Sequence, residues 1–333
     1  MRIILAYGVI TGGGCERRMG DLCRWLLDNG HEAWILASQF DALGEAVVHG
    51  QCGVPIDHVL YNVTGEGGWH YGTMAEFVGA KVKELGADLV DVQWHPGFVP
   101  MSWECPSVAT IHGITSRPPP AIFSGVIAVE DGIVDGSGYR SGAPVIWNWV
   151  NLRRFPFREE LGEGLCFVGR AFKAVNVRKV AHFYDGPIDG YGTSTAPQGD
   201  MPANWRWYGF TDLATVFPRY RVAFASAQCA MEAMAAGRLV IAGQSLHLPN
   251  MGTFHPEGCL VTPENVDALA RANSFSYRRG SEPTAWDVWA DVQTALGNDM
   301  LEERRALREW IEERHNIDVQ CGRILDFYQE VTG

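Results

Sequence analysis

Short apolar runs alternate with stretches of mixed polarity along the whole chain. Such runs, bounded by turn residues, are typical of buried strands. In the first half, strands are expected at 2–8, 32–38, 57–63, 89–94, 107–113 and 125–130. The second half repeats the pattern, with strands expected at 165–171, 180–186, 205–210, 221–226, 238–243 and 259–262.

Helical periodicity separates several of these runs. Between residues 16 and 29, four apolar residues recur at the spacing of one helix face, and Gly30 can end the helix. A second compact helix is expected at 228–237, and the last thirty or so residues are also expected to be helical. Strands that alternate with helices predict a parallel sheet covered by helices on both faces.

The pattern predicts an α/β protein of two Rossmann-like, doubly wound parallel-sheet domains facing across a cleft. A chain of 333 residues can form two domains of ordinary size. We expect an N-terminal domain of residues 1–155, a C-terminal domain of 156–300 and a C-terminal helical segment of 301–333. Ligands of open α/β sheets bind at the carboxyl ends of the strands, so the functional residues are expected there.

Composition excludes several classes of protein. Apolar residues make up 47% of the chain, yet no apolar run reaches the roughly 20 residues needed to span a bilayer. The first residues lack the pattern of a signal peptide, so a cytoplasmic protein is expected. A net charge of −12 argues against an extended surface for nucleic acid. The eight cysteines include no CxxC pair, so reduced thiols and no metal site are expected.

A glycine-rich loop, TGGGCERR at 11–18, follows the first expected strand. Consecutive glycines let backbone N–H groups approach an anion, and the helix start that follows adds positive dipole character. Gly12, Gly13 and Gly14 are therefore candidate contacts for a phosphate group. A tight strand-to-helix turn without a ligand is the alternative interpretation.

Two further candidates lie in the second half. Arg170 and Lys173 follow a strand that ends near Gly169, where two cations can hold a diphosphate. A solvated basic helix start is the alternative. Glu232 lies in an otherwise apolar, Ala-rich helix, and a carboxylate there needs donors such as sugar hydroxyls. Its alternative role is a favourable interaction with the helix dipole.

Two histidines follow neighbouring strands of the first half. His112 comes at the end of the fifth expected strand, where it can donate a hydrogen bond or shuttle a proton. His95 follows the preceding strand and competes with it for that role.

Six segments, in order, resemble the GT-B glycosyltransferases and, within them, glycosyltransferase family 4 (glycosyl transferases group 1) in a compact form. The more specific are CFVGRAFKAVNV (166–177), which resembles "fvGRl…KGvd", and CAMEAMAAGRLVIAG (229–243), which resembles "lEAMAaGlPVVa". The others are GGGCERRMGDLCRWLLDNGHEAWILA, ADLVDVQWH with PSVATIHG, PVIWNWVNLRRFPF and WYGFTD, so the resemblance spans about residues 1–270.

This resemblance implies transfer of a sugar, in the hexosyltransferase class, from a nucleoside-diphosphate sugar such as a UDP-sugar. It also implies retention of configuration, with no metal and no further cofactor. Arg170 and Lys173 would bind the diphosphate and neutralise the leaving group, and Glu232 would hold the ribose. His112 would contact the transferred sugar, and the loop at 12–14 would face the donor phosphates.

The acceptor is expected on the N-terminal domain, as is general in this fold. Candidate acceptor-side residues are Tyr7, Trp69, His70 and His95. Aromatic side chains suit a sugar and a nucleobase equally. The sequence therefore does not choose between a small molecule, a glycan and, as a weaker alternative, DNA as the acceptor. It does not determine the oligomeric state either.

Three alternatives share parts of this interpretation. A modified base in DNA could be the acceptor, and the paired cations in suitable loops are then Arg17, Arg18, Arg153, Arg154, Arg278 and Arg279. A non-catalytic nucleotide-sugar-binding protein is the second, because Phe224 stands eight positions before Glu232, where the family usually has a glutamate. A GT-B epimerase is the third, although it would need acid and base groups around the sugar.

Overall fold

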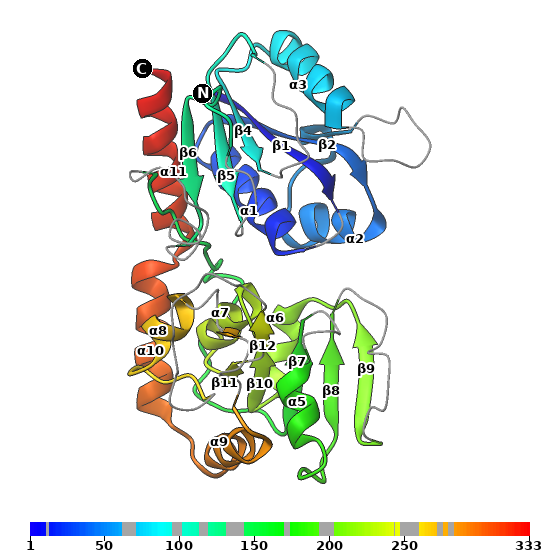
Figure 1. The fold of residues 1–333 in the computed structure, drawn as a ribbon, viewed down its shortest axis with the longest axis vertical. Coiled ribbons are helices and arrows are strands. Elements are labelled where there is room, and N and C mark those ends of the chain that lie inside the picture. The colour runs from blue at the N-terminus through cyan, green and yellow to red at the C-terminus, as the bar shows by residue number, and fades with distance from the viewer. Residues whose placement is uncertain are drawn as a thin grey trace. The chain divides into compact units, whose positions relative to one another are not determined.

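The chain divides into two compact units, Met1–Asn148 with Ile317–Gly333, and Trp149–Asn316. Figure 1 shows the elements of each unit. Sequence analysis placed the domain boundary after residue 155 and set residues 301–333 apart as a separate segment. In the structure the first stretch of unit 1 ends at Asn148, and residues 301–333 are divided: 301–316 belong to the second unit and 317–333 to the first. The computed structural model describes residues 1–10, 13–61, 71–94, 102–112, 119–130, 143–169, 174–192, 203–242, 244–246, 260–271, 276–278 and 283–333.

The first unit is built on a six-stranded parallel sheet with the order β3-β2-β1-β4-β5-β6. The order reverses between β1 and β4, which makes this the topological switch point where α/β sheets bind ligands. All six strands expected in this half are present, some with shifted ends. Their bounds are β1 Arg2–Ile10, β2 Glu32–Phe40, β3 Val59–Tyr61, β4 Leu89–Gln93, β5 Ser107–Ile111 and β6 Gly125–Ala128.

Helices cover both faces of this sheet. Met74, Val78 and Val82 of α3 (Tyr71–Leu85) pack on one face. The opposite face carries α1 (Gly14–Asp28) and α11 (Ile317–Thr332). A Cβ on Gly125 of β6 would lie 2.7 Å from the Phe327 ring of α11, so this helix packs directly on the strand. Shorter elements are α2 Ala42–Glu45, the π-helix η1 Ala46–Gln51 and the 3-10 helix η2 Ile56–His58.

The second unit has a five-stranded parallel sheet with the order β11-β10-β7-β8-β9, so its switch point lies between β7 and β10. The strands are β7 Leu165–Val168, β8 Ile188–Tyr191, β9 Trp205–Gly209, β10 Val222–Ala225 and β11 Leu239–Ala242, with a separate pair β12 Gln244–Leu246 and β13 Ser276–Arg278. The helices are α5 Val175–Val180, α6 Leu213–Val216, η4 Phe217–Arg219, α7 Gln228–Ala235, α8 Val266–Arg271, α9 Ala285–Gly297 and α10 Leu301–Arg314. Two parallel-sheet α/β domains are thus confirmed.

Two expected strands of this unit are wrong. Residues 180–186 contain the end of α5 and a turn, because Val177, Val180 and Ala181 face the core at helical spacing. The strand follows instead at Ile188–Tyr191. At 259–262, the described residues form no strand, and Leu260 makes only an isolated antiparallel bridge to Ile241.

Two buried arginines hold the segment that precedes the second sheet. Arg238 donates to the carbonyl oxygens of Arg158, at 2.8 Å, and Glu160, at 2.9 Å. Arg304 of α10 donates to those of Glu159, at 2.7 Å, and Gly237, at 2.9 Å. Each guanidinium therefore binds several backbone carbonyl groups at once and holds this segment against the second unit. Within the described ranges, no helix is both long and apolar enough to cross a membrane.

Candidate functional site

A polar cluster lies at the carboxyl edge of the first sheet, beside its switch point. Asp91 and Gln93 of β4 project toward the face that carries α1 and α11, because the alternate residues of this strand pack with α3. Thr110 of β5 projects the same way, and His112 follows two residues later. Because side chains alternate between the two faces along each strand, these polar residues of neighbouring strands lie together on one face of the sheet.

Asp91 is the centre of this cluster. It is fully buried, and its two oxygens accept hydrogen bonds from the hydroxyls of Tyr328, at 2.5 Å, and Thr110, at 2.8 Å. Burial raises the pKa of Asp91, while these two hydrogen bonds and the Arg18 cation act in the opposite direction. Arg18 belongs to α1 and Tyr328 to α11. The carboxyl group therefore joins both helices to β4.

His112 hydrogen-bonds to this cluster through Gln93. Its Nε2 lies 2.7 Å from Oε1 of Gln93, and within the described residues this is the hydrogen bond of the ring. Burial lowers the pKa of His112 to about 3, and the nearby Arg18 cation acts in the same direction. The imidazole is therefore uncharged at neutral pH, and it can bind a substrate through hydrogen bonds rather than as a cation.

The start of α1 lies at the same sheet edge. Gly13 is the N-cap residue, without a side-chain cap, and Gly14 begins the helix. Backbone N–H groups at such a helix start can bind an anion. Gly12 lies outside the described residues. Tyr7, predicted on the acceptor side, is half-buried, and its hydroxyl hydrogen-bonds to the thiol of Cys15.

The equivalent edge of the second sheet lies at the ends of β7 and β10. Gly169 follows β7 with a φ of 152°, a conformation that favours glycine. The predicted Arg170 and Lys173 come next and lie outside the described residues. Ala227, between β10 and α7, has a φ of 51°, which is strained for a residue with a Cβ. Sparsely populated backbone conformations of this kind cluster at ligand-binding sites.

Glu232 lies one turn into α7, near this edge. It is 1% exposed, and its Oε1 accepts a hydrogen bond of 3.3 Å from the Gln228 amide. The same amide donates to the carbonyl oxygen of Trp149 at 2.6 Å. Glu232, the predicted ribose contact, is therefore buried in the middle of α7, and its ribose role stays a prediction.

Sequence reasoning missed Asp91, Gln93 and Tyr328. The signal was present in LVDVQW, where an acidic and an amide side chain alternate with apolar residues in an otherwise buried strand. Tyr328 is distant in sequence and had no such signal. The predicted Trp69, His70 and His95 lie outside the described residues.

Two of the six arginines considered for DNA, Arg17 and Arg18, are not surface cations, whereas Arg153 is exposed. Arg17 is 8% exposed and Arg18 is 4% exposed. Arg17 donates to Gln51, and Arg18 lies beside Asp91. Among the residues that the structure describes, no group of three or more His, Cys, Asp or Glu side chains could hold a metal ion.

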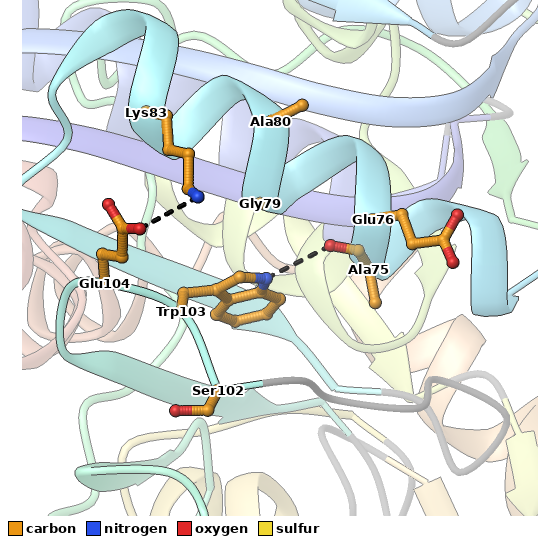
Figure 2. A pocket seen from close by; sticks show the side chains of 8 residues that line it. All are labelled: Ala75, Glu76, Gly79, Ala80, Lys83, Ser102, Trp103 and Glu104. Atoms are coloured by element: carbon orange, nitrogen blue, oxygen red, sulfur yellow. Dashed lines mark hydrogen bonds and ion pairs between the residues drawn. The ribbon is translucent and has the colours of Figure 1, made fainter.

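A separate pocket lies between α3 and residues 102–104 (Figure 2). The Trp103 indole donates to the carbonyl oxygen of Ala75 at 3.2 Å, and Lys83 pairs with Glu104 at 2.9 Å. Residues 102–104 precede β5, whereas His112 follows it, so the pocket and the polar cluster lie toward opposite ends of this strand. The pocket is lined by Ala75, Glu76, Gly79, Ala80, Lys83, Ser102, Trp103 and Glu104.

Comparison with known proteins identifies the fold. No protein-family model matches the chain, and no curated protein matches its sequence. A glycosyltransferase from Rickettsia africae has a similar structure over 99% of this chain and 98% of its own, with 14% identity and a TM-score of 0.69. A glycosyltransferase involved in avilamycin A biosynthesis matches over 100% and 98% of the two chains, with 14% identity and a TM-score of 0.63.

A third similar structure is the UDP-GlcNAc 2-epimerase from Neisseria meningitidis bound to UDP-GlcNAc. It covers 99% of this chain and 100% of its own, with 12% identity and a TM-score of 0.64. With two parallel-sheet units and likeness over the full length of these proteins, the chain has the predicted GT-B fold.

Proposed function

We propose that this protein is a glycosyltransferase that transfers a sugar from a nucleoside-diphosphate sugar to an acceptor. The observation that carries the proposal is the position of His112. In a GT-B chain, an uncharged imidazole lies at the carboxyl edge of the first sheet, held by a buried amide, and an uncapped glycine helix start lies at the same edge. Such an edge is where α/β sheets bind their ligands, and an imidazole suits hydroxyl groups.

The donor site in this proposal is the edge of the second sheet. By resemblance to glycosyltransferase family 4, Arg170 and Lys173 bind the diphosphate and Glu232 the ribose. Fixed cations stabilise a departing nucleoside diphosphate electrostatically, so the proposed reaction needs no metal. We also assign retention of configuration and the hexosyltransferase class from this resemblance. UDP-GlcNAc, which is bound in the Neisseria epimerase structure, is the first donor to test.

The acceptor side in this proposal is the first unit, with Tyr7, Trp69, His70 and His95 as candidates. A small molecule or a glycan is proposed over DNA, because the net charge is −12 and one of the candidate arginine pairs, Arg17 and Arg18, is buried. His112 contributes a hydrogen bond to a hydroxyl group of the reacting sugar or of the acceptor.

The proposal is tested by measuring nucleoside-diphosphate release from UDP-, GDP-, dTDP-, ADP- and CDP-sugars, and then nucleotide affinity in variants. We expect Arg170→Ala and Lys173→Ala each to weaken nucleoside-diphosphate binding by about 1.5–3 kcal/mol, the range for hydrogen bonds to charged groups. The matched control is Arg305→Ala, an exposed arginine of α10 paired with Glu159 and Glu302. Wild-type affinity in both variants would contradict the diphosphate assignment.

The likeness to the Neisseria epimerase supports a second candidate, an epimerase acting on a nucleotide sugar. NMR spectra of an incubated nucleotide sugar distinguish the two activities. Epimerisation changes the sugar while the nucleotide stays attached, whereas transfer or slow hydrolysis releases the nucleoside diphosphate. Binding without either reaction would indicate a non-catalytic nucleotide-sugar-binding protein.

A further inference from the structure

The hydrogen bond between His112 and Gln93 determines which ring nitrogen is available to a substrate. A neutral imidazole carries one proton, so one nitrogen donates and the other accepts. If Gln93 presents its oxygen, Nε2 of His112 carries the proton and Nδ1 keeps its lone pair. If the amide were reversed, Nε2 would accept, and Nδ1 would carry the proton.

Asp91 favours one of these two orientations. It lies two residues before Gln93 on the same face of β4, and it accepts from Tyr328 and Thr110 with Arg18 nearby. These partners are donors or a cation, which is the environment of a carboxylate. A carboxylate attracts the NH2 end of a neighbouring amide and repels its oxygen.

The orientation of Gln93 agrees with this electrostatic preference. Its Oε1 lies 2.7 Å from His112, and its side chain is among the groups that lower the pKa of Asp91 against the larger effect of burial. The side chain is 2% exposed, and its buried Nε2 makes no hydrogen bond of ordinary geometry to a described residue. Attraction to Asp91 is therefore the remaining favourable interaction of this NH2 group.

We propose that Asp91, acting through Gln93, fixes His112 as the tautomer with the proton on Nε2, so that Nδ1 accepts a hydrogen bond from a substrate hydroxyl group. Asp91 and Gln93 are positioning residues in this scheme, and His112 is the group that touches substrate. The role toward substrate rests on the proposed function, but the tautomer does not. The substrate group is one that donates a hydrogen bond, as a sugar hydroxyl does, rather than an anionic oxygen.

The test is the 15N NMR spectrum of the histidine rings in the full-length protein without ligand. His112→Gln identifies the signals of this ring among those of the ten histidines. We expect Nε2 protonated and Nδ1 unprotonated, unchanged between pH 8 and pH 5. The charged group that acts on the ring is Arg18 of α1, which itself interacts with Asp91 of β4 and Tyr328 of α11. A protonated Nδ1, or a doubly protonated ring in this pH range, would overturn the proposal.

Variants separate positioning from simple packing. In Asp91→Asn the new amide can donate to Gln93, so we expect Gln93 to reverse and Nδ1 of His112 to become protonated. If this variant does not fold, Gln93→Met serves instead, and a mixture of both tautomers is expected. Tyr328→Phe is the matched control, because it removes a hydrogen bond from the same cluster but keeps the carboxylate. An unchanged tautomer in the folded Asp91→Asn or Gln93→Met variant would contradict the assigned roles.

Failure of this inference and failure of the proposed function are distinguishable. The spectrum is recorded without substrate, so it reports the tautomer whether or not the protein transfers sugars. A confirmed tautomer with no nucleotide binding would leave the positioning intact and remove the glycosyltransferase proposal. Nucleotide release together with the opposite tautomer would support the glycosyltransferase proposal and overturn the positioning of His112.

Discussion

His112 is uncharged at neutral pH because its ring is largely shielded from water and lies near a cation. Burial, followed by the Arg18 charge, lowers its pKa to about 3. The sequence predicted that this residue lies at a strand end, because it directly follows the short apolar run SVATI. Its protonation state was not predictable, because Arg18 reaches it from a helix whose packing is fixed only in three dimensions. The proton-shuttle role considered from sequence stays a prediction.

Because the His112 ring is uncharged in the folded protein, the free energy of unfolding depends on pH. In the unfolded chain the ring has an ordinary pKa of about 6.5, so below that pH the unfolded state takes up a proton that the folded state does not. The folded state therefore loses stability as the pH falls from about 6.5 toward 3. Because His112 is partly accessible, we expect a loss of about 1–2 kcal/mol at pH 5 relative to pH 7.5.

Melting temperatures of wild type and His112→Gln at the two pH values measure this effect. Between pH 7.5 and pH 5, the melting temperature of wild type should fall by roughly 2–8 °C more than that of the variant, given the size of the first unit. The control is His182→Gln, at an exposed position, which should behave as wild type does. Equal falls in wild type and His112→Gln would contradict the low pKa.

At the scale of elements, α11 is joined to the first sheet by a polar contact inside an apolar interface. Tyr328 is fully buried, and its hydroxyl donates to Asp91 at 2.5 Å. We expect Tyr328→Phe to destabilise the protein by about 1–3 kcal/mol, because the carboxyl group loses a donor and cannot reach water instead. Thermal unfolding measures the change.

The control for this variant is Tyr61→Phe, which removes the hydroxyl of a tyrosine that is 52% exposed. Its melting temperature should match that of wild type. A wild-type melting temperature for Tyr328→Phe as well would show that the Asp91 contact contributes nothing to the docking of α11.

Elements were predictable where apolar periodicity is strong. All six strands of the first sheet follow from their apolar runs, as does α1. Strand β8 was missed because IDGY contains Asp and Gly, which are rare in strands. Asp189 is stabilised there by Tyr220, at 2.5 Å, and Arg206, at 2.6 Å, and Gly190 leaves room for the Trp205 and Trp207 rings. These partners are distant in sequence, so the local sequence of β8 does not indicate a strand.

At the scale of the whole molecule, the resemblance to GT-B glycosyltransferases predicted the fold that the structure has. It could not predict how the last two helices divide. Arg304 ties α10 to the second unit through backbone carbonyl groups, and Tyr328 ties α11 to the first. A buried polar side chain whose partners are distant in sequence contributes to each attachment. A periodic helical pattern alone cannot specify that choice.

The central claim is that the chain binds a nucleoside diphosphate. It is tested most directly by thermal unfolding of the wild-type protein with UDP, GDP, dTDP, ADP and CDP in turn. A ligand at 100 times its dissociation constant adds about 2.7 kcal/mol of stability, enough for a clear rise in melting temperature. We predict a rise with one of these nucleotides that is reduced in Arg170→Ala. No rise with any of them would contradict the glycosyltransferase proposal and leave the GT-B fold alone.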